Sequence, residues 1–304
     1  MRAIAGVRMG QGSNLISVSE LRSRLDDPGL RIIDCRFDLA DPSAGRQHYL
    51  QGHIPGAVHA DLDQDLAAPI SPQSGRHPLP DVAMFAATLG RLGVSNVTDV
   101  VVHDAGSGAV AARAWWLLRW LGHERVQLLD GGYAHWTAAD GPATSGAEQL
   151  PPAEFVPHSR EQIVLTTAEL ANDINGIDGL RLYDARDAAR FRGEIEPIDP
   201  VAGHIPGSQS LPYPVSLNED GGWKSKEALE ELWLSVLGED KNAPWAVMCG
   251  SGVTACHLAV SGMEAGYREP RLYVGSWSEW IRDPRRPVAL GDGSKQGPWA
   301  ADLA

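Results

Sequence analysis

The chain has 304 residues, of which 43% are hydrophobic and 21% are charged, and it carries a formal net charge of −13. This composition is typical of packed globular domains, and no apolar run reaches the ~18 residues that a membrane-spanning helix needs. The excess of acidic residues would repel phosphate backbones and anionic lipid surfaces, so neither nucleic acid nor a membrane is expected as a partner.

The first predicted domain covers residues 14–138 and alternates short strands with helices. A capping box at Ser17–Glu20 predicts a helix start, because the hydroxyl and the glutamate satisfy each other's unpaired amides. Later, Val100–His103 predicts a buried strand that leads into a glycine-rich turn. Residues 109–121 then predict a buried helix that ends at Gly122. This alternation is typical of a parallel sheet covered by helices.

The second predicted domain, residues 161–290, repeats the first after a predicted linker at 139–160 that is rich in Ala, Gly, Pro and Ser. Four pairs of motifs recur at an offset of about 150 residues: Ser17–Glu20 and Thr166–Glu169, Ile32–Arg36 and Leu182–Arg186, Gly52–Gly56 and Gly203–Gly207, and Leu128–Trp136 and Leu272–Trp280. The sequence therefore predicts an α/β fold of two homologous domains, each a parallel sheet flanked by helices.

The two copies differ at one turn. In the second copy the strand Trp245–Met248 leads into Cys249 and then into the small-residue loop Gly250–Ala255, whereas the first copy has Asp104 at the cysteine position. A sulfur placed between a strand and a helix faces backbone N–H groups and the positive end of the helix dipole, and both favour the thiolate. Cys249 is therefore predicted to be a nucleophile, and the first copy is predicted to be inactive.

With these motifs the chain resembles the rhodanese superfamily, and more narrowly its two-domain sulfurtransferases, over roughly residues 14–288. Such proteins have an inactive first domain with aspartate at the cysteine position, as at Asp104, and paired Gly-His-Ile-Pro-Gly turns. The loop Cys249–Ala255 is similar to that of 3-mercaptopyruvate sulfurtransferases. The resemblance implies tandem rhodanese-like domains, of which only the second is catalytic.

The resemblance also implies a covalent mechanism. The Cys249 thiolate would attack the sulfur of a small anionic donor, 3-mercaptopyruvate, releasing pyruvate and leaving a persulfide on the cysteine. A thiol acceptor such as thioredoxin, or cyanide, would then collect the sulfur.

Further site residues follow from the resemblance. A relay of Ser251, His77 and Asp63 would approach the nucleophile, so that the first domain would contribute to the active site. Arg190 would bind the acid group of the donor through its planar fork. The remaining predicted donor-binding residues are those of the loop: Gly250, Gly252, Val253 and Thr254. The family usually has a second donor arginine nine residues after the first, but here that position is Asp199.

Three functions are alternatives to sulfur transfer from 3-mercaptopyruvate. Thiosulfate sulfurtransferases usually carry an arginine and a lysine after the cysteine, where this chain has Gly250 and Ser251, yet Asp199 leaves thiosulfate as an alternative donor. A Cdc25-like phosphatase needs an arginine at the sixth position after the cysteine, where Ala255 stands, and is disfavoured. A non-catalytic sulfur carrier or docking module is the more distant alternative.

The cysteines indicate a reducing compartment. Cys35, Cys249 and Cys256 are odd in number and have no CxxC spacing, which argues against a disulfide or zinc framework. The first fourteen residues contain no apolar stretch typical of a secretory signal, so a cytoplasmic location is expected. No histidine–carboxylate spacing predicts a metal site and no phosphate-binding loop predicts a nucleotide, so no cofactor is expected.

Overall fold

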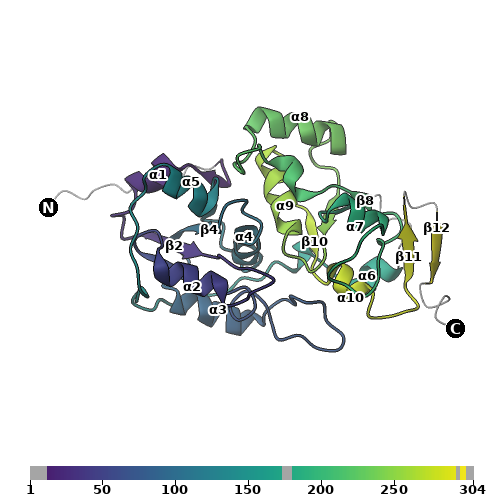
Figure 1. Cartoon of the computed structure of the whole chain (residues 1–304), viewed down its shortest axis with the longest axis horizontal. Helices are drawn as coiled ribbons and strands as arrows, with labels where there is room; N and C mark the ends of the chain where they lie inside the picture. The colour runs from purple at the N-terminus through teal and green to yellow at the C-terminus, as the bar shows by residue number, and fades with distance from the viewer. Residues whose placement is uncertain (1–11, 173–179, 292–294, 299–304) are drawn as a thin grey trace. The chain divides into compact units, whose positions relative to one another are not determined.

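A computed structural model describes residues 12–172, 180–291 and 295–298, which divide into two compact units (Figure 1). The first unit contains the described residues up to Asp65, residues 81–159 and the short segment Glu219–Gly222. The second contains Leu66–Pro80, Arg160–Asn218 and the described residues from Trp223 on. The segment Leu66–Pro80 therefore belongs to the second unit, although in the sequence it lies within the first half of the chain.

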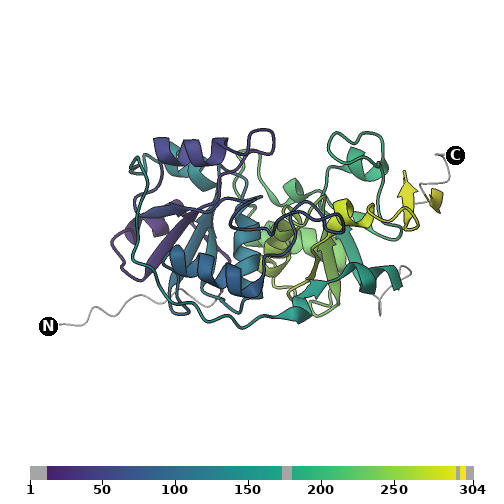
Figure 2. The same cartoon turned by 90° about the horizontal axis from the view of Figure 1, so that it is seen from below.

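The first unit is a parallel sheet flanked by helices (Figure 2). Its strands have the order β1-β5-β4-β2-β3, and every neighbouring pair is parallel. Its elements in chain order are β1 (Leu15–Ile16), α1 (Val18–Ser23), β2 (Leu30–Asp34), α2 (Ala44–Gln51), β3 (Ala57–His59), α3 (Val82–Arg91), β4 (Asp99–His103), α4 (Ala111–Trp120), β5 (Val126–Leu129) and α5 (Gly132–Ala138).

The second unit repeats this arrangement with the strand order β6-β10-β9-β7-β8, again parallel throughout. A separate antiparallel pair, β11–β12, follows near the end of the chain. The elements are η1 (Glu161–Ile163), β6 (Val164–Leu165), α6 (Thr167–Asn172), β7 (Arg181–Asp184), α7 (Ala188–Arg192), β8 (Gln209–Ser210), η3 (Tyr213–Ser216), α8 (Lys226–Leu237), β9 (Trp245–Met248), α9 (Ala255–Glu264), β10 (Arg271–Tyr273), α10 (Ser276–Trp280), β11 (Pro287–Leu290) and β12 (Lys295–Pro298).

The predicted α/β fold, with one parallel sheet in each homologous half, is confirmed. β4 and β9 are the middle strands of their sheets, and both are buried along their whole length. Ligands of open parallel sheets bind at the carboxyl ends of the strands. Asp104 and Cys249 follow these ends directly, so the fold places both residues where such sheets carry their chemistry.

The helices after these two turns end in the same way. The C-cap residue of α4 and that of α9 are each followed by a glycine with positive φ. The φ value is 82° at Gly122 and 83° at Gly266. Glycine adopts this left-handed conformation without the steric cost of a Cβ atom. The stop at Gly122 agrees with the sequence-based prediction, and the stop at Gly266 repeats it in the second unit.

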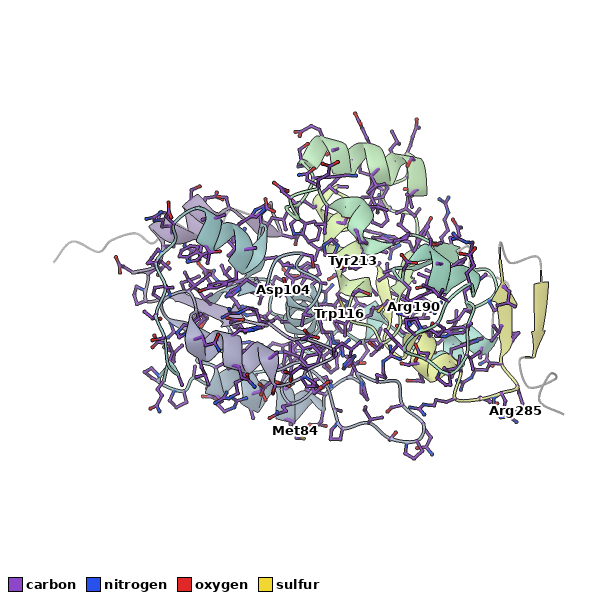
Figure 3. All side chains as sticks on the ribbon, viewed as in Figure 1. Met84, Asp104, Trp116, Arg190, Tyr213 and Arg285 are labelled. Carbon is purple, nitrogen blue, oxygen red and sulfur yellow. The ribbon has the colours of Figure 1, made fainter. Side chains whose placement is uncertain are left out.

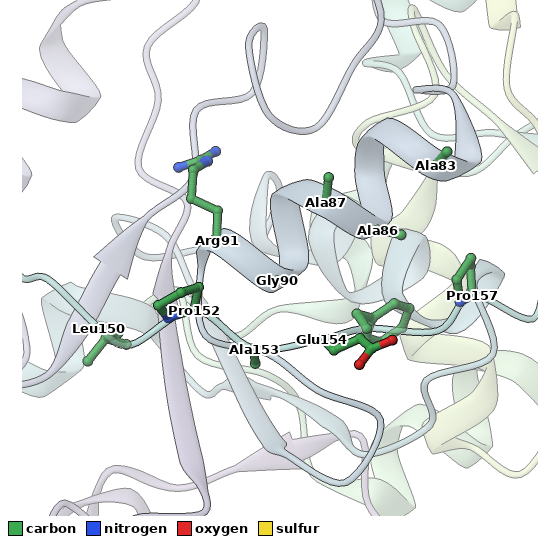
Figure 4. A pocket seen from close by; sticks show the side chains of 11 residues that line it. Ala83, Ala86, Ala87, Gly90, Arg91, Leu150, Pro152, Ala153, Glu154 and Pro157 are labelled. Atoms are coloured by element: carbon green, nitrogen blue, oxygen red, sulfur yellow. The ribbon is translucent and has the colours of Figure 1, made fainter.

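A cavity of the first unit lies between α3 and the segment 150–157 (Figure 4). It has a volume of about 740 Å³ and is lined mainly by alanine, proline and glycine, together with Arg91 and Glu154. The Ala153 N–H donates to the Gly90 carbonyl at 2.9 Å, and a Cβ atom at Gly90 would lie 2.5 Å from the Ala153 carbonyl oxygen. The predicted linker segment is thus held against α3, and its cavity is lined by no nucleophile.

Candidate active site

Cys249 is anchored through its backbone at the carboxyl end of β9. Its N–H donates to Ser276 Oγ at 3.1 Å, and its carbonyl accepts from the Trp277 N–H at 3.0 Å. The sulfur accepts the Gly252 N–H at 3.1 Å, and the residue is only 2% exposed. Backbone donors stabilise an anion better than a neutral thiol. The sulfur is therefore held before the first turn of α9, in the place the sequence predicted.

Gly252 is required by the shape of this loop. Its φ is +77°, and a Cβ atom there would lie 2.6 Å from the Val274 carbonyl oxygen. Only glycine combines that conformation with such a close approach. Cys256 lies one turn further on and donates its thiol to the Gly252 carbonyl at 3.3 Å, a contact within the loop–helix junction.

Two members of the predicted relay meet in the second unit. His77 Nδ1 and Ser251 Oγ are 2.7 Å apart, and both side chains are buried. His77 comes from the segment Leu66–Pro80, which is anchored here because the Arg76 N–H donates to Ser278 Oγ at 3.1 Å. This pair can move a proton close to the nucleophile.

Asp63, the third predicted member, belongs to the first unit. Its N–H donates to the Asp61 carboxylate at 2.9 Å. Burial, and then the nearby charge of Asp61, raise the pKa of the Asp63 carboxyl. Its part in the relay stays a prediction.

Arg190, near the end of α7 (Figure 3), contributes a guanidinium close to Gly250. Its Nη2 contacts Glu196 Oε1 at 2.7 Å and Asp199 Oδ2 at 3.2 Å. A Cβ atom at Gly250 would lie 3.8 Å from Arg190 Nη2 and 3.9 Å from Nη1. The guanidinium therefore lies next to the residue that follows Cys249, and it is held there by two carboxylates.

A second guanidinium in this place was missed by sequence reasoning. Arg76 pairs with Asp199 through Nη1, and a Cβ atom at Gly250 would lie only 2.8 Å from Arg76 Nη2. The signal in the sequence was weak, since Arg76 stands out only as the neighbour of His77. Cations therefore reach Gly250 from two segments outside the loop.

The two carboxylates respond in opposite ways to this environment. Burial would raise the pKa of Glu196, but hydrogen bonds from Arg190 and from the N–H groups of Asp199 and Ile198 hold it below its usual value. Burial dominates at Asp199 and raises its pKa, and the charge of Glu196 adds to this effect while Arg76 opposes it. The site thus combines two guanidinium groups with two carboxylates, and no net charge is buried when both carboxylates are ionised.

The other loop residues contribute through the backbone. Val253 is buried, and its carbonyl accepts the Cys256 N–H at 3.1 Å. Thr254 caps α9 without a hydrogen bond from its side chain to the helix. Arg192, two residues after Arg190 in the sequence, is exposed and pairs with Glu194.

Within residues 12–172, 180–291 and 295–298, no group of three or more His, Cys, Asp or Glu side chains is arranged to hold a metal ion. In the same ranges, no helix has the length and apolar character that crossing a membrane requires.

Comparison with known proteins assigns the fold to a family. The model of the rhodanese-like domain matches residues 17–139 and again residues 166–283. A Pseudomonas aeruginosa protein named "Probable 3-mercaptopyruvate sulfurtransferase" is 48% identical over 282 residues, which cover 92% of this chain and 99% of that protein. A thiosulfate sulfurtransferase of Gallus gallus is 36% identical over 258 residues, covering 83% of this chain and 86% of the relative.

Solved structures agree with this assignment. A crystal structure of SseA from Escherichia coli, a 3-mercaptopyruvate sulfotransferase, is 34% identical and matches with a TM-score of 0.76, covering 88% of this chain and 100% of that one. The predicted resemblance is therefore confirmed. The chain belongs to the family of rhodanese-like domain proteins and carries this domain twice.

Proposed function

We propose that this chain is a sulfurtransferase that takes sulfur from 3-mercaptopyruvate, holds it as a persulfide on Cys249 and passes it to a thiol or to cyanide. The observation that carries the proposal is the position of the buried Cys249 sulfur, which accepts the Gly252 N–H in the loop before α9. Two guanidinium groups lie close to Gly250, the next residue in the chain. One relative is named for 3-mercaptopyruvate and another for thiosulfate, and both names support sulfur transfer as the reaction class.

The first half-reaction balances without a cofactor. The Cys249 thiolate attacks the donor sulfur, an S–S bond forms, and the carbon–sulfur bond breaks with its electron pair leaving on the pyruvate enolate. The enolate takes up a proton and departs as pyruvate. In the second half-reaction an acceptor thiolate or cyanide attacks the outer sulfur of the persulfide, which returns Cys249 to its thiolate.

Ser251 and His77 are proposed to supply the proton for the enolate. Their contact of 2.7 Å lets the imidazole and the hydroxyl exchange a proton, and the buried setting limits exchange with water. Asp63 would orient His77 as the third member of the relay. General acid catalysis of this kind typically contributes about 10²–10⁴ in rate.

Donor binding is proposed to rest on Arg190 and on the loop. The guanidinium would pair with the carboxylate of the keto acid, and the absence of a side chain at Gly250 leaves room beside the sulfur. Gly252, Val253 and Thr254 would offer backbone N–H groups to the developing negative charge.

The same site supports thiosulfate as a second candidate donor. Two guanidinium groups beside Gly250 suit a dianion, although Glu196 and Asp199 partly neutralise them. A non-catalytic sulfur carrier would also load a persulfide, but it would not turn over with a donor and a small acceptor.

The deciding experiment compares kcat/KM for 3-mercaptopyruvate and thiosulfate on one preparation, with dithiothreitol or cyanide as the acceptor. We expect a preference of ~100-fold or more for 3-mercaptopyruvate, about 2.7 kcal/mol. A thiosulfate preference would make the second candidate the function. Persulfide formation, detected by intact-protein mass, without turnover on either donor would instead identify a carrier.

The proposal includes the division of labour between the domains and the setting of the reaction. Residues 161–290 would form the catalytic domain, and residues 14–138 would form an inactive domain joined to it by the linker 139–160. Thioredoxin is the proposed protein acceptor. A cytoplasmic location is proposed because all three cysteines are free thiols in the structure and a persulfide enzyme needs a reduced nucleophile.

A further inference from the structure

Ser276, the first residue of α10, has an unusual backbone conformation. Its φ is +53°, and among the residues that the structure describes the only other non-glycine residue with a positive φ is Asp140. Aspartate adopts this left-handed region more readily than most residues, whereas serine does so at a steric cost. Ser276 is also fully buried. Strain of this kind persists only where the surrounding structure holds it, and it is concentrated at functional sites.

The first copy of the domain has glycine at the equivalent position. The segment Leu272–Trp280 repeats Leu128–Trp136, so that Ser276 corresponds to Gly132. Gly132 has a φ of +55°, which glycine adopts without the cost of a Cβ atom. A Cβ atom at Gly132 would lie only 2.8 Å from the Asp104 carbonyl oxygen. Both copies therefore use the same backbone conformation here, but only the second copy adds a side chain to it.

The Ser276 hydroxyl connects the nucleophile to the end of the neighbouring strand. Its Oγ accepts the Cys249 N–H at 3.1 Å and donates to the Tyr273 carbonyl at 2.9 Å. Tyr273 is the last residue of β10, and Cys249 follows the last residue of β9, the strand that pairs with β10. One buried hydroxyl therefore joins Cys249 to the end of β10 and satisfies a buried backbone N–H.

The same turn also fixes the group that donates to the sulfur. The Gly252 N–H donates to Cys249 Sγ at 3.1 Å, and Gly252 packs against the Val274 carbonyl, whose oxygen would lie 2.6 Å from a Cβ atom at Gly252. Val274 and Ser276 are two residues apart in one turn. Loss of the Ser276 hydroxyl should therefore loosen Cys249 while Gly252 stays in place, which lengthens the contact between the sulfur and its N–H donor.

We propose that Ser276 is a positioning residue of this sulfurtransferase, which holds the Cys249 sulfur where it accepts the Gly252 N–H. The inference rests on the proposed function and adds a residue outside the nucleophile loop to it. In this role Ser276 does not touch the donor, because it acts through the backbone of Cys249. The second copy tolerates a strained serine at this position since glycine has no hydroxyl to offer.

The test compares Ser276→Ala, which removes the hydroxyl and keeps the strain, with Ser276→Gly, which removes both. The first readout is the rate at which iodoacetamide alkylates Cys249, followed by the mass of the Cys249 peptide from about pH 5 to 10. We expect both variants to slow alkylation about tenfold below the midpoint of the pH profile, which moves the midpoint up by about one pH unit. Persulfide formation from 3-mercaptopyruvate in a single turnover should also slow about tenfold.

Ser261→Ala is the matched control. Ser261 is a fully buried serine of α9 that accepts hydrogen bonds from Trp233 Nε1 at 2.8 Å and from Ser216 Oγ at 2.7 Å. Neither partner belongs to the nucleophile loop. Ser261→Ala should lower the thermal midpoint of unfolding as Ser276→Ala does, but its alkylation and persulfide rates should stay within about twofold of the wild type.

Thermal midpoints separate the strain from the hydroxyl. Ser276→Gly should unfold at least about 2 °C above Ser276→Ala, because glycine relieves the left-handed backbone, yet it should react as slowly. Where Ser276→Ala does not fold, the unstrained Ser276→Gly decides the test by itself. Rates within twofold of the wild type in Ser276→Gly would overturn the inference, since a permissive backbone would then suffice. An equal slowing in Ser261→Ala would also overturn it.

Failure of the inference can be separated from failure of the proposed function. Alkylation needs neither a sulfur donor nor an acceptor, so it reports on Cys249 even in a protein that transfers no sulfur. A wild type that is alkylated but turns over neither donor would refute the function. The difference in alkylation between the wild type and Ser276→Gly would still support the positioning role at about tenfold or refute it within twofold.

Discussion

The turns after β4 and β9 have the same backbone anchors but hold different groups. The Asp104 carbonyl accepts the Tyr133 N–H at 2.9 Å, as the Cys249 carbonyl accepts the Trp277 N–H at 3.0 Å. The next carbonyls, of Ala105 and Gly250, accept from Ala134 at 3.0 Å and Ser278 at 2.9 Å. The two turns therefore start from equivalent backbone positions in the two copies of the domain.

In the first turn, the Asp104 side chain accepts the backbone N–H groups of the turn itself. The Asp104 carboxylate accepts four backbone N–H groups at distances of 2.8–3.2 Å, from Gly106, Gly108, Val110 and Ala111. Such a ring of N–H groups is an anion-binding nest, and here a fixed carboxylate fills it. In the second turn the equivalent residue is Cys249, whose sulfur accepts the Gly252 N–H at 3.1 Å. The two copies of the fold unit therefore direct backbone N–H groups at a carboxylate in one turn and at a sulfur in the other.

The two turns also differ at the next residue, which is Ala105 in the first copy and Gly250 in the second. Ala105 has a side chain in the first turn, whereas a Cβ atom at Gly250 would meet the Arg76 guanidinium at 2.8 Å. The second turn thus has Arg76, Arg190 and His77 as neighbours, and none of these side chains belongs to its own segment. The following predictions test this contrast, from the largest expected effect to the smallest.

Cys249→Ser should reduce sulfur transfer by at least ~10³-fold, more than 4 kcal/mol, because an alcohol is a far weaker nucleophile than a thiolate. Cys256→Ser is the matched control, since its thiol donates to the Gly252 carbonyl and a serine hydroxyl can donate to the same oxygen, and it should keep most of the activity. Adding Asp104→Cys to Cys249→Ser should not restore turnover. Steady-state assays with 3-mercaptopyruvate measure all three, and any transfer by the Asp104→Cys double variant would show that the loop alone suffices.

Asp104→Ala should lower the free energy of unfolding by about 3 kcal/mol, because four buried or partly buried N–H groups lose a charged acceptor. Asp104→Asn keeps one oxygen acceptor and should lose about half as much. Urea denaturation followed by tryptophan fluorescence measures both variants. A loss below ~1 kcal/mol in Asp104→Ala would mean that water satisfies the nest as well as the carboxylate does.

Ser251→Ala should lower kcat for 3-mercaptopyruvate by about 30-fold, near 2 kcal/mol, because the contact with His77 is removed. Replacing Ser107, the serine between the two glycines of the first turn, by alanine is the control and should leave kcat unchanged. The rate of persulfide formation in a single turnover distinguishes the two outcomes. Equal rates for wild type and Ser251→Ala would remove the proton relay from the mechanism.

Glu196 should make a small, pH-dependent contribution to stability. Burial opposes ionisation, but hydrogen bonds from Arg190 hold the folded pKa of Glu196 below its ordinary value of 4.5. A lowered carboxyl pKa contributes stability above the unfolded value, and this contribution is lost as the pH falls through the folded pKa. The difference in unfolding free energy between wild type and Glu196→Gln should be about 1 kcal/mol at neutral pH and should shrink below pH ~4. Urea midpoints across this range measure the trend, and a constant difference would exclude the effect.

Much of this protein was readable from its sequence because the relevant signals are local. The capping boxes, the strand patterns and the glycine stops depend on neighbours within a few residues, and they recur in both halves. The exchange of Cys249 for Asp104 at equivalent turns likewise follows from a motif and its repeat.

The tertiary structure decided which side chains surround that motif. Arg76 and Asp199 are more than 100 positions apart, and no periodicity links them, yet they form an ion pair beside Gly250. Sequence reasoning treated Asp199 as the loss of a cation, whereas the structure places a replacement cation on that same carboxylate. Local patterns encode elements and turns through backbone preferences, but long-range charge pairs exist only once the chain has folded, and here they define the surroundings of the nucleophile.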